Sequence, residues 1–145
     1  PGVITHSGDE GVGPFLAETD VLVCLLPLTA DTTGILNHVL FKQLARDGVL
    51  GKPCLINAGR GGLQIEREIV AALDDGTLGH ATLDVFEMEP LPQSSPLWRH
   101  PCVTITPHNA ADSDADTISD YVVSQIRAHE RGEALRNVVD RSRGY

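Results

Sequence analysis

Short apolar runs alternate with segments of helical periodicity along the whole 145-residue chain. The most apolar run, VLVCLL at residues 21–26, is closed by Pro27. Such a run predicts a strand that is buried on both faces at the centre of a sheet. Because strands separated by helical segments are typical of a parallel sheet covered by helices, the alternation predicts an α/β fold.

The remaining elements are predicted from the same periodicity. Apolar runs predict further strands over 3–6, 53–58, 81–86 and 103–106. Amphipathic spacing predicts helices over 10–18, 39–45, 65–73 and 113–133. In the third of these helices, Ile65, Ile69 and Leu73 recur every four residues and therefore share one face.

The sequence lacks the glycine motif G-x-G-x-x-G, which holds a dinucleotide pyrophosphate at a helix N-terminus. Gly8, Gly11 and Gly13 have the wrong spacing for it. The chain also begins with proline and enters directly on an apolar stretch, so we expect it to be the later part of a longer protein. The predicted fold is therefore the later part of a Rossmann-like, doubly wound parallel sheet.

The composition argues against several classes of binding partner. The net charge of −9, from 20 acidic and 11 basic side chains, argues against nucleic-acid binding. No apolar run approaches the roughly 20 residues of a membrane span, so no membrane partner is expected. The cysteines at 24, 54 and 102 lack close pairing, which predicts buried thiols in the reducing cytoplasm. The histidines form neither H-E-x-x-H nor an i, i+4 pair, so no metal site is predicted.

Polar side chains follow three of the predicted strands. Arg60 stands in INAGRGG, Glu89 in LDVFEMEPLP and His108 in TITPHNA. Because the carboxyl ends of parallel strands open into one crevice, these residues are predicted to meet there. A guanidinium, a carboxylate and an imidazole suit chemistry on a carbonyl that carries a carboxylate. Taken singly, each has an ordinary reading as a solvated arginine, a surface acid or a structural histidine.

Asp84 is a further candidate, because it lies inside the apolar string LDVF. A carboxylate within a strand costs free energy unless a ligand amide, a backbone group or a cation satisfies it.

The strings LLPLTADTTGILN, INAGRGG, LDVFEMEPLP and TPHNA resemble the D-isomer-specific 2-hydroxyacid dehydrogenases. PLWRHPCVTITPH and the ending VDRSRGY most resemble the glyoxylate/hydroxypyruvate reductase A branch of that family. The resemblance covers essentially the whole chain, and it implies hydride transfer between NAD(P)H and a small 2-oxoacid. It divides the chain into a partial dinucleotide-binding domain, residues 1–112, and the terminal helix and tail, residues 113–145, which would return to a missing substrate domain.

The resemblance also implies a role for each candidate residue. Arg60 would bind the substrate carboxylate, His108 would be the acid/base, and Glu89 would pair with His108. Asp84 would contact the nicotinamide amide. The positions implied to line the cofactor are Pro27, Thr32, Ala58, Gly59, Arg60, Asp84, His108 and Ala110.

Within that family the branch resemblance favours NADPH, and family members usually form homodimers. Without the phosphate loop and the substrate segment, the 145-residue chain alone is expected to be inactive and to bind cofactor weakly.

Formate dehydrogenases resemble the chain less, since they carry glutamine where Glu89 stands. Two alternatives stay open: a non-enzymatic NAD(H)-sensing regulator of the same fold, and an acidic signalling module with a phosphorylatable aspartate, for which HSGDEGVG is a poor match.

Overall fold

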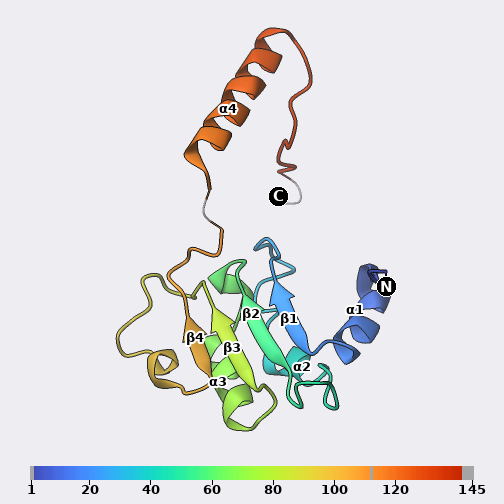
Figure 1. Ribbon diagram of the computed structural model, residues 1–145, viewed down its shortest axis with the longest axis vertical. Coiled ribbons are helices and arrows are strands. Elements are labelled where there is room, and N and C mark those ends of the chain that lie inside the picture. The colour runs from blue at the N-terminus through green and yellow to red at the C-terminus, as the bar shows by residue number, and fades with distance from the viewer. Residues whose placement is uncertain (1, 112, 142–145) are drawn as a thin grey trace. The chain divides into compact units, whose positions relative to one another are not determined.

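The computed structural model describes residues 2–111 and 113–141. It divides into two compact units, Pro1–His108 and Asn109–Tyr145. The first unit is a parallel β-sheet with helices, as the alternation of apolar runs and helical segments predicts (Figure 1). The predicted α/β class, with a Rossmann-like parallel sheet, is confirmed.

The sheet has four parallel strands in the order β1-β2-β3-β4. The strands are β1 (Val21–Cys24), β2 (Cys54–Asn57), β3 (His80–Leu83) and β4 (Val103–Ile105). Their last residues are in register, since Cys24 pairs with Asn57, Asn57 with Leu83, and Leu83 with Ile105. The segments that follow the four strands therefore leave the sheet at one edge, the upper one in Figure 1.

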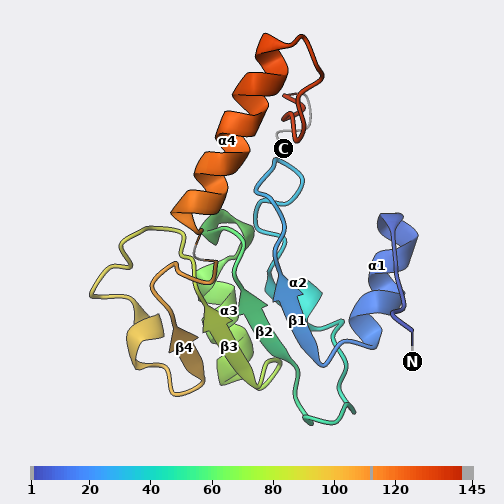
Figure 2. The ribbon, with the colours of Figure 1, turned by 45° about the horizontal axis from the view of Figure 1, so that its top comes forward.

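The helical elements differ in length. They are α1 (Gly8–Ala17), α2 (His38–Phe41), α3 (Glu66–Asp74), α4 (Ala115–Glu130) and two 3-10 turns, η1 (Gly61–Leu63) and η2 (Pro96–Arg99). In the first unit, α2 and α3 lie on the same face of the sheet (Figure 2). Phe41 of α2 and Ile69 of α3 are fully buried there, together with Leu55 of β2.

Burial alternates along the strands, which shows that the sheet is covered unequally. Leu22 and Cys24 face the core, whereas Val21 and Val23 are 43% and 51% exposed. The prediction that this run is a central strand buried on both faces is therefore wrong for the described residues, in which β1 is an edge strand. The apolar run predicts a strand, but its burial and its neighbours depend on which other segments pair with it and cover it.

Several element boundaries also differ from the predictions. Residues 3–6 are not a strand, because among the described residues no strand pairs with them. The helix predicted over 39–45 is the short α2, whose N-terminus is capped by Asn37 accepting from the Leu40 N–H. The helix predicted over 113–133 begins after the N-cap Asp114 and ends before Gly132, whose φ is +72°.

The second unit begins at Asn109 and contains α4 and the described residues that follow it. Tyr121 Oη donates to the Arg136 carbonyl oxygen at 3.1 Å, and the Arg136 guanidinium lies 5.8 Å from the centre of the Tyr121 ring. No described residue of α4 is buried, so its apolar side chains Ile118, Val122 and Ile126 are about half exposed.

Among the described residues, no helix has the length and apolar character needed to cross a membrane.

Candidate active site

Glu89 and His108 are in direct contact at the carboxyl-terminal edge of the sheet. Glu89 lies in the segment after β3, and His108 lies three residues beyond β4. Glu89 Oε2 and His108 Nδ1 are 2.8 Å apart, and Glu89 Oε1 accepts from the Phe86 N–H at 3.0 Å. The two side chains are 38% and 52% exposed, so the pair is open to a ligand.

The ionisation of Glu89 determines which of these two side chains donates the hydrogen bond. The hydrogen bond with His108 lowers the pKa of Glu89, and the Phe86 N–H adds to this effect, while the nearby Asp84 carboxylate opposes it. Glu89 is therefore ionised at neutral pH, and a carboxylate only accepts hydrogen bonds. Nδ1 of His108 must then carry the proton, which leaves Nε2 as the ring nitrogen that can exchange a proton with a bound molecule.

The backbone of His108 has an unusual conformation. Its φ of +54° lies in the left-handed region, which a residue with a side chain adopts at a cost of about 1–3 kcal/mol. Such conformations cluster at functional sites, where the surrounding structure maintains them. Here the contact with Glu89 fixes the imidazole at the end of β4.

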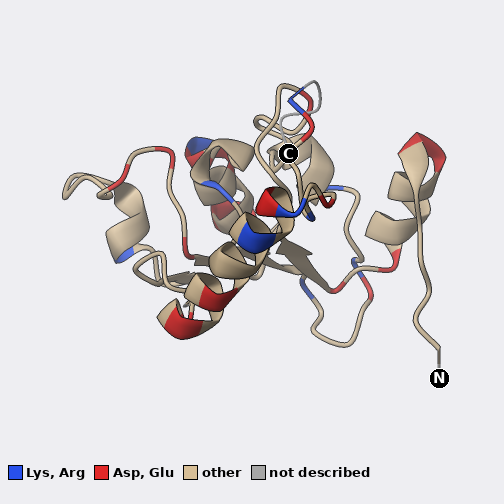
Figure 3. Cartoon of the chain, turned by 90° about the horizontal axis from the view of Figure 1, so that it is seen from above, with Lys and Arg blue, Asp and Glu red and all other residues tan. Residues whose placement is uncertain are grey.

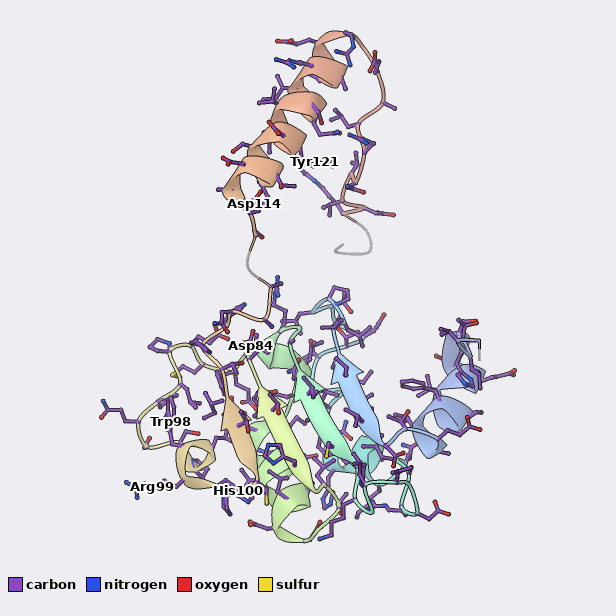
Figure 4. The ribbon with its side chains drawn as sticks, in the orientation of Figure 1. Asp84, Trp98, Arg99, His100, Asp114 and Tyr121 are labelled. Atoms are coloured by element: carbon purple, nitrogen blue, oxygen red, sulfur yellow. The ribbon has the colours of Figure 1, made fainter. Side chains whose placement is uncertain are left out.

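Asp84 lies directly after β3 and is only 4% exposed (Figure 4). Its backbone N–H donates to the Asn57 carbonyl oxygen at 3.0 Å, and its carboxylate accepts a hydrogen bond from Thr106 Oγ1. The hydroxyl of Thr106 thus helps to offset the burial of the Asp84 charge. Sequence reasoning missed Thr106, although its place between β4 and His108 is a signal that could have found it.

Arg60 follows β2 at the same edge, in the glycine-rich turn. It is exposed, and its Nη1 donates to the carbonyl oxygen of Gly59 at 2.7 Å. A Cβ at Gly59 would lie 2.9 Å from the Leu26 carbonyl oxygen, so the turn needs glycine to approach the segment after β1. The structure thus brings Glu89 and His108 together and places Arg60 at the same edge with a separate contact.

Two buried side chains beneath this turn were also missed. Asn57 and Gln64 are 0% and 2% exposed, and Asn57 Nδ2 donates to Gln64 Oε1 at 2.8 Å. The signal that could have found Asn57 is a polar residue at the end of the apolar strand CLIN.

The other predicted cofactor-lining residues lie near the same edge or in the second unit. Thr32 Oγ1 donates to the Pro27 carbonyl oxygen at 2.7 Å, which closes the loop after β1. The Ala58 N–H donates to the Cys24 carbonyl oxygen at 3.1 Å, which joins the ends of β2 and β1. Ala110 falls in the second unit and is exposed.

A hollow of about 270 Å³ lies beside the Glu89 and His108 pair. Trp98 and Ile105 form part of its apolar wall. The Trp98 indole Nε1 donates to the Pro92 carbonyl oxygen at 2.9 Å, which ties η2 to the segment that carries Glu89. The site therefore combines a hydrogen-bonded carboxylate and imidazole with an apolar wall.

Charged residues lie on helices and connecting segments and not on the four strands, and acidic ones are the more numerous (Figure 3). Across residues 2–111 and 113–141, no three histidine, cysteine or acidic side chains cluster as metal ligands would. Cys24, Cys54 and Cys102 are free thiols, and burial raises the pKa of Cys24.

Comparison with known proteins identifies relatives of this chain. Residues 6–110 match the family model described as D-isomer specific 2-hydroxyacid dehydrogenase, NAD binding domain. The chain is 48% identical over all 145 residues to glyoxylate/hydroxypyruvate reductase A of Salmonella paratyphi B, of which it covers 45%. The chain thus spans about half the length of the relatives it matches.

Two solved structures are similar to most of the chain. One is a probable 2-hydroxyacid dehydrogenase from Rhizobium etli in complex with NADP, HEPES and L(+)-tartaric acid, with 55% identity and a TM-score of 0.89 over 94% of this chain and 43% of that one. The other is an NADPH-dependent glyoxylate/hydroxypyruvate reductase from Sinorhizobium meliloti in complex with NADP and sulfate, with 50% identity and a TM-score of 0.92 over 96% of this chain and 44% of that one.

Proposed function

Because the chain belongs to the D-isomer-specific 2-hydroxyacid dehydrogenase family, we propose that it forms the catalytic half of an NAD(P)H-dependent reductase of small 2-oxoacids. Glyoxylate and hydroxypyruvate are the proposed substrates, since relatives of this chain are named for them. The observation that carries the proposal is the Glu89 and His108 pair, 2.8 Å apart at the sheet edge that also carries Arg60.

His108 is the proposed acid/base. Its Nδ1–H is held by Glu89, so Nε2 can deliver a proton to the carbonyl oxygen of a 2-oxoacid. The Glu89 carboxylate accepts the Nδ1–H and so holds the ring in one orientation for this transfer.

Arg60 is the proposed site for the substrate carboxylate. Its exposed guanidinium can release the Gly59 carbonyl oxygen and donate two parallel hydrogen bonds to a carboxylate. This contact would orient the keto carbon and stabilise the negative charge that develops on oxygen.

Asp84 is the proposed contact for the nicotinamide carboxamide, because its carboxylate is a hydrogen-bond acceptor. Pro27 and Thr32 are the proposed loop contacts beside the adenosine half of the cofactor, and Ala58, Gly59 and Ala110 are the proposed backbone positions that line it. When bound, NAD(P)H supplies the hydride that reduces the keto carbon. Both similar structures contain NADP and one of them is described as NADPH-dependent, which favours NADPH here.

The proposed activity belongs to a protein of the relatives' full length, acting as a homodimer in the cytoplasm. The two proposed parts of this chain are residues 1–112 for cofactor and residues 113–145 as helix and tail of the substrate domain. By itself the 145-residue chain is expected to show no substantial turnover and weak cofactor binding, because its sequence lacks the pyrophosphate-binding motif.

The test is a steady-state assay of the full-length protein with glyoxylate, hydroxypyruvate, NADPH and NADH. We expect turnover with a 2-oxoacid, and in Arg60→Ala a raised KM and a lowered kcat. Full activity in Arg60→Ala would refute the role of Arg60. Tight NADPH binding without turnover by the unmodified protein would instead identify a regulator that senses the cofactor.

A further inference from the structure

Two amide side chains are buried beneath the turn that carries Arg60. Asn57 is 0% exposed and Gln64 is 2% exposed. Burial of an amide is unfavourable unless hydrogen bonds replace those lost to water, and a leucine or methionine would fill similar space without that requirement. The presence of two adjacent amides therefore calls for a role other than packing.

Their hydrogen bonds run without a break between two segments of the site. Gln64 Nε2 donates to the Val85 carbonyl oxygen at 3.0 Å, and Gln64 Oε1 accepts from Asn57 Nδ2 at 2.8 Å. Asn57 Nδ2 also donates to the Arg60 carbonyl oxygen at 3.2 Å, and Asn57 Oδ1 accepts from the Gly59 N–H at 3.1 Å. We call the side chains of Asn57 and Gln64 and the Val85 carbonyl the amide brace.

Each end of the amide brace reaches a residue of the candidate site. One end holds the backbone of Gly59 and Arg60. The other end holds Val85, which lies between Asp84 and Phe86, and the Phe86 N–H binds the Glu89 carboxylate. The amide brace therefore connects the Arg60 turn to the segment that carries Asp84 and Glu89.

Two further contacts join the same pair of segments. A Cβ on Gly61 would lie 1.7 Å from the Phe86 carbonyl oxygen, which shows that the two backbones touch. The Glu66 N–H donates to Glu87 Oε1 at 2.7 Å, and the Glu87 N–H donates to Glu66 Oε1 at 2.8 Å. These reciprocal bonds connect the start of α3 to the residue after Phe86.

We propose that Gln64 is a positioning residue, which holds the Arg60 turn in a fixed place relative to residues 84–89. Groups that act together on one substrate must be held to within about 0.5 Å, and buried hydrogen bonds beneath a site provide such support. The roles of Arg60 and Glu89 rest on the proposed function, whereas the amide brace is a property of this chain.

The first test uses hydrogen exchange, measured by NMR on the 145-residue chain with Gln64→Leu. Leucine keeps most of the volume but removes the hydrogen bonds of the glutamine amide to Asn57 and Val85. We expect protection of the Gly59 N–H to fall about tenfold, because Asn57 loses the partner that orients it. Thr77→Val is the matched control, since Thr77 is 7% exposed and hydrogen-bonded but precedes β3 at the opposite end of the strands. It should leave Gly59 protection unchanged.

A second variant separates hydrogen bonding from packing. In Gln64→Glu the introduced carboxyl can accept from Asn57, but it can donate to Val85 only when protonated. Protection of Gly59, corrected for intrinsic exchange, should therefore recover as the pH falls, whereas in Gln64→Leu it should stay low. Asp84, Glu66 and Glu87 are the acids of the adjoining segments, so the unmodified chain is measured over the same pH range as the reference.

The full-length protein supplies the functional readout. Gln64→Leu should raise the KM for glyoxylate and lower kcat, with the Kd for NADPH changed less than either. Unchanged Gly59 protection in Gln64→Leu, an equal loss in Thr77→Val, or pH-independent protection in Gln64→Glu would each overturn the proposal. If the exchange results hold but the unmodified full-length protein shows no turnover, the proposed function fails and the amide brace stands.

Discussion

Replacement of Glu89 by glutamine removes one negative charge and leaves the volume of the side chain nearly unchanged. In the structure this carboxylate accepts from His108 Nδ1 at 2.8 Å and from the Phe86 N–H at 3.0 Å. A hydrogen bond to a charged group contributes about 1.5–3 kcal/mol where solvent is excluded. Because the two side chains are 38% and 52% exposed, solvent screening reduces the expected loss to about 1 kcal/mol of unfolding free energy at pH 6.

The pH dependence of this loss has a definite sign. The contacts of Glu89 lower its pKa in the folded state. Such a carboxyl stabilises the fold at pH values above its ordinary pKa of about 4.3, and the contribution is lost as the pH falls through the lowered value. The difference in unfolding free energy between the unmodified chain and Glu89→Gln should therefore reach its full value at pH 6 and shrink below about pH 4.

Urea denaturation followed by tryptophan fluorescence measures this difference. Trp98 is the single tryptophan of the chain, and it lines the hollow beside Glu89, so it reports on the first unit. Asp31→Asn, at an exposed acid of the same unit, is the control and should change stability by less than about 0.5 kcal/mol. An effect of Glu89→Gln that is equal at pH 6 and pH 3, or no effect at either, would refute the assigned contacts.

Three further substitutions test other contacts of the site. Thr106→Val removes the hydroxyl that donates to the buried Asp84 carboxylate, and it should cost about 1–3 kcal/mol in urea denaturation; an unchanged midpoint would contradict that bond. Gly61→Ala places a methyl group against the Phe86 carbonyl oxygen and should lower the thermal midpoint, with Gly13→Ala, where the added Cβ meets nothing within 4 Å, as its control. In the full-length protein, Arg60→Lys should raise the KM for glyoxylate about tenfold or more, because an ammonium cannot reproduce the two-pronged contact; an unchanged KM would count against it.

The parallel sheet could be predicted from sequence because each strand is a compact apolar run. The carboxyl ends of parallel strands share an edge. Because Arg60, Glu89 and His108 each follow a predicted strand, they could be predicted to lie at that edge. The contact between Glu89 and His108 depends in addition on the conformation of the segment after β3, which local sequence patterns do not determine.

The burial of Asn57 and Gln64 was not predicted from the sequence. Asn57 is a polar residue near the end of the strand predicted over 53–58, and Gln64 follows the glycine-rich turn. Their burial follows from the way α3 and the segment after β3 close over the turn, which is a tertiary effect. The position of β1 at a sheet edge has the same origin, because pairing partners and not apolar content decide it.

The hydrogen bond between Thr106 and Asp84 has a consequence for folding fidelity. β4 is the shortest strand, with three residues, and it aligns through the pairing of Ile105 with Leu83. A slip of β4 by one residue would turn every side chain to the opposite face and move Thr106 by about 3.3 Å. The buried Asp84 carboxylate would then lose this donor, so the misaligned register is disfavoured electrostatically.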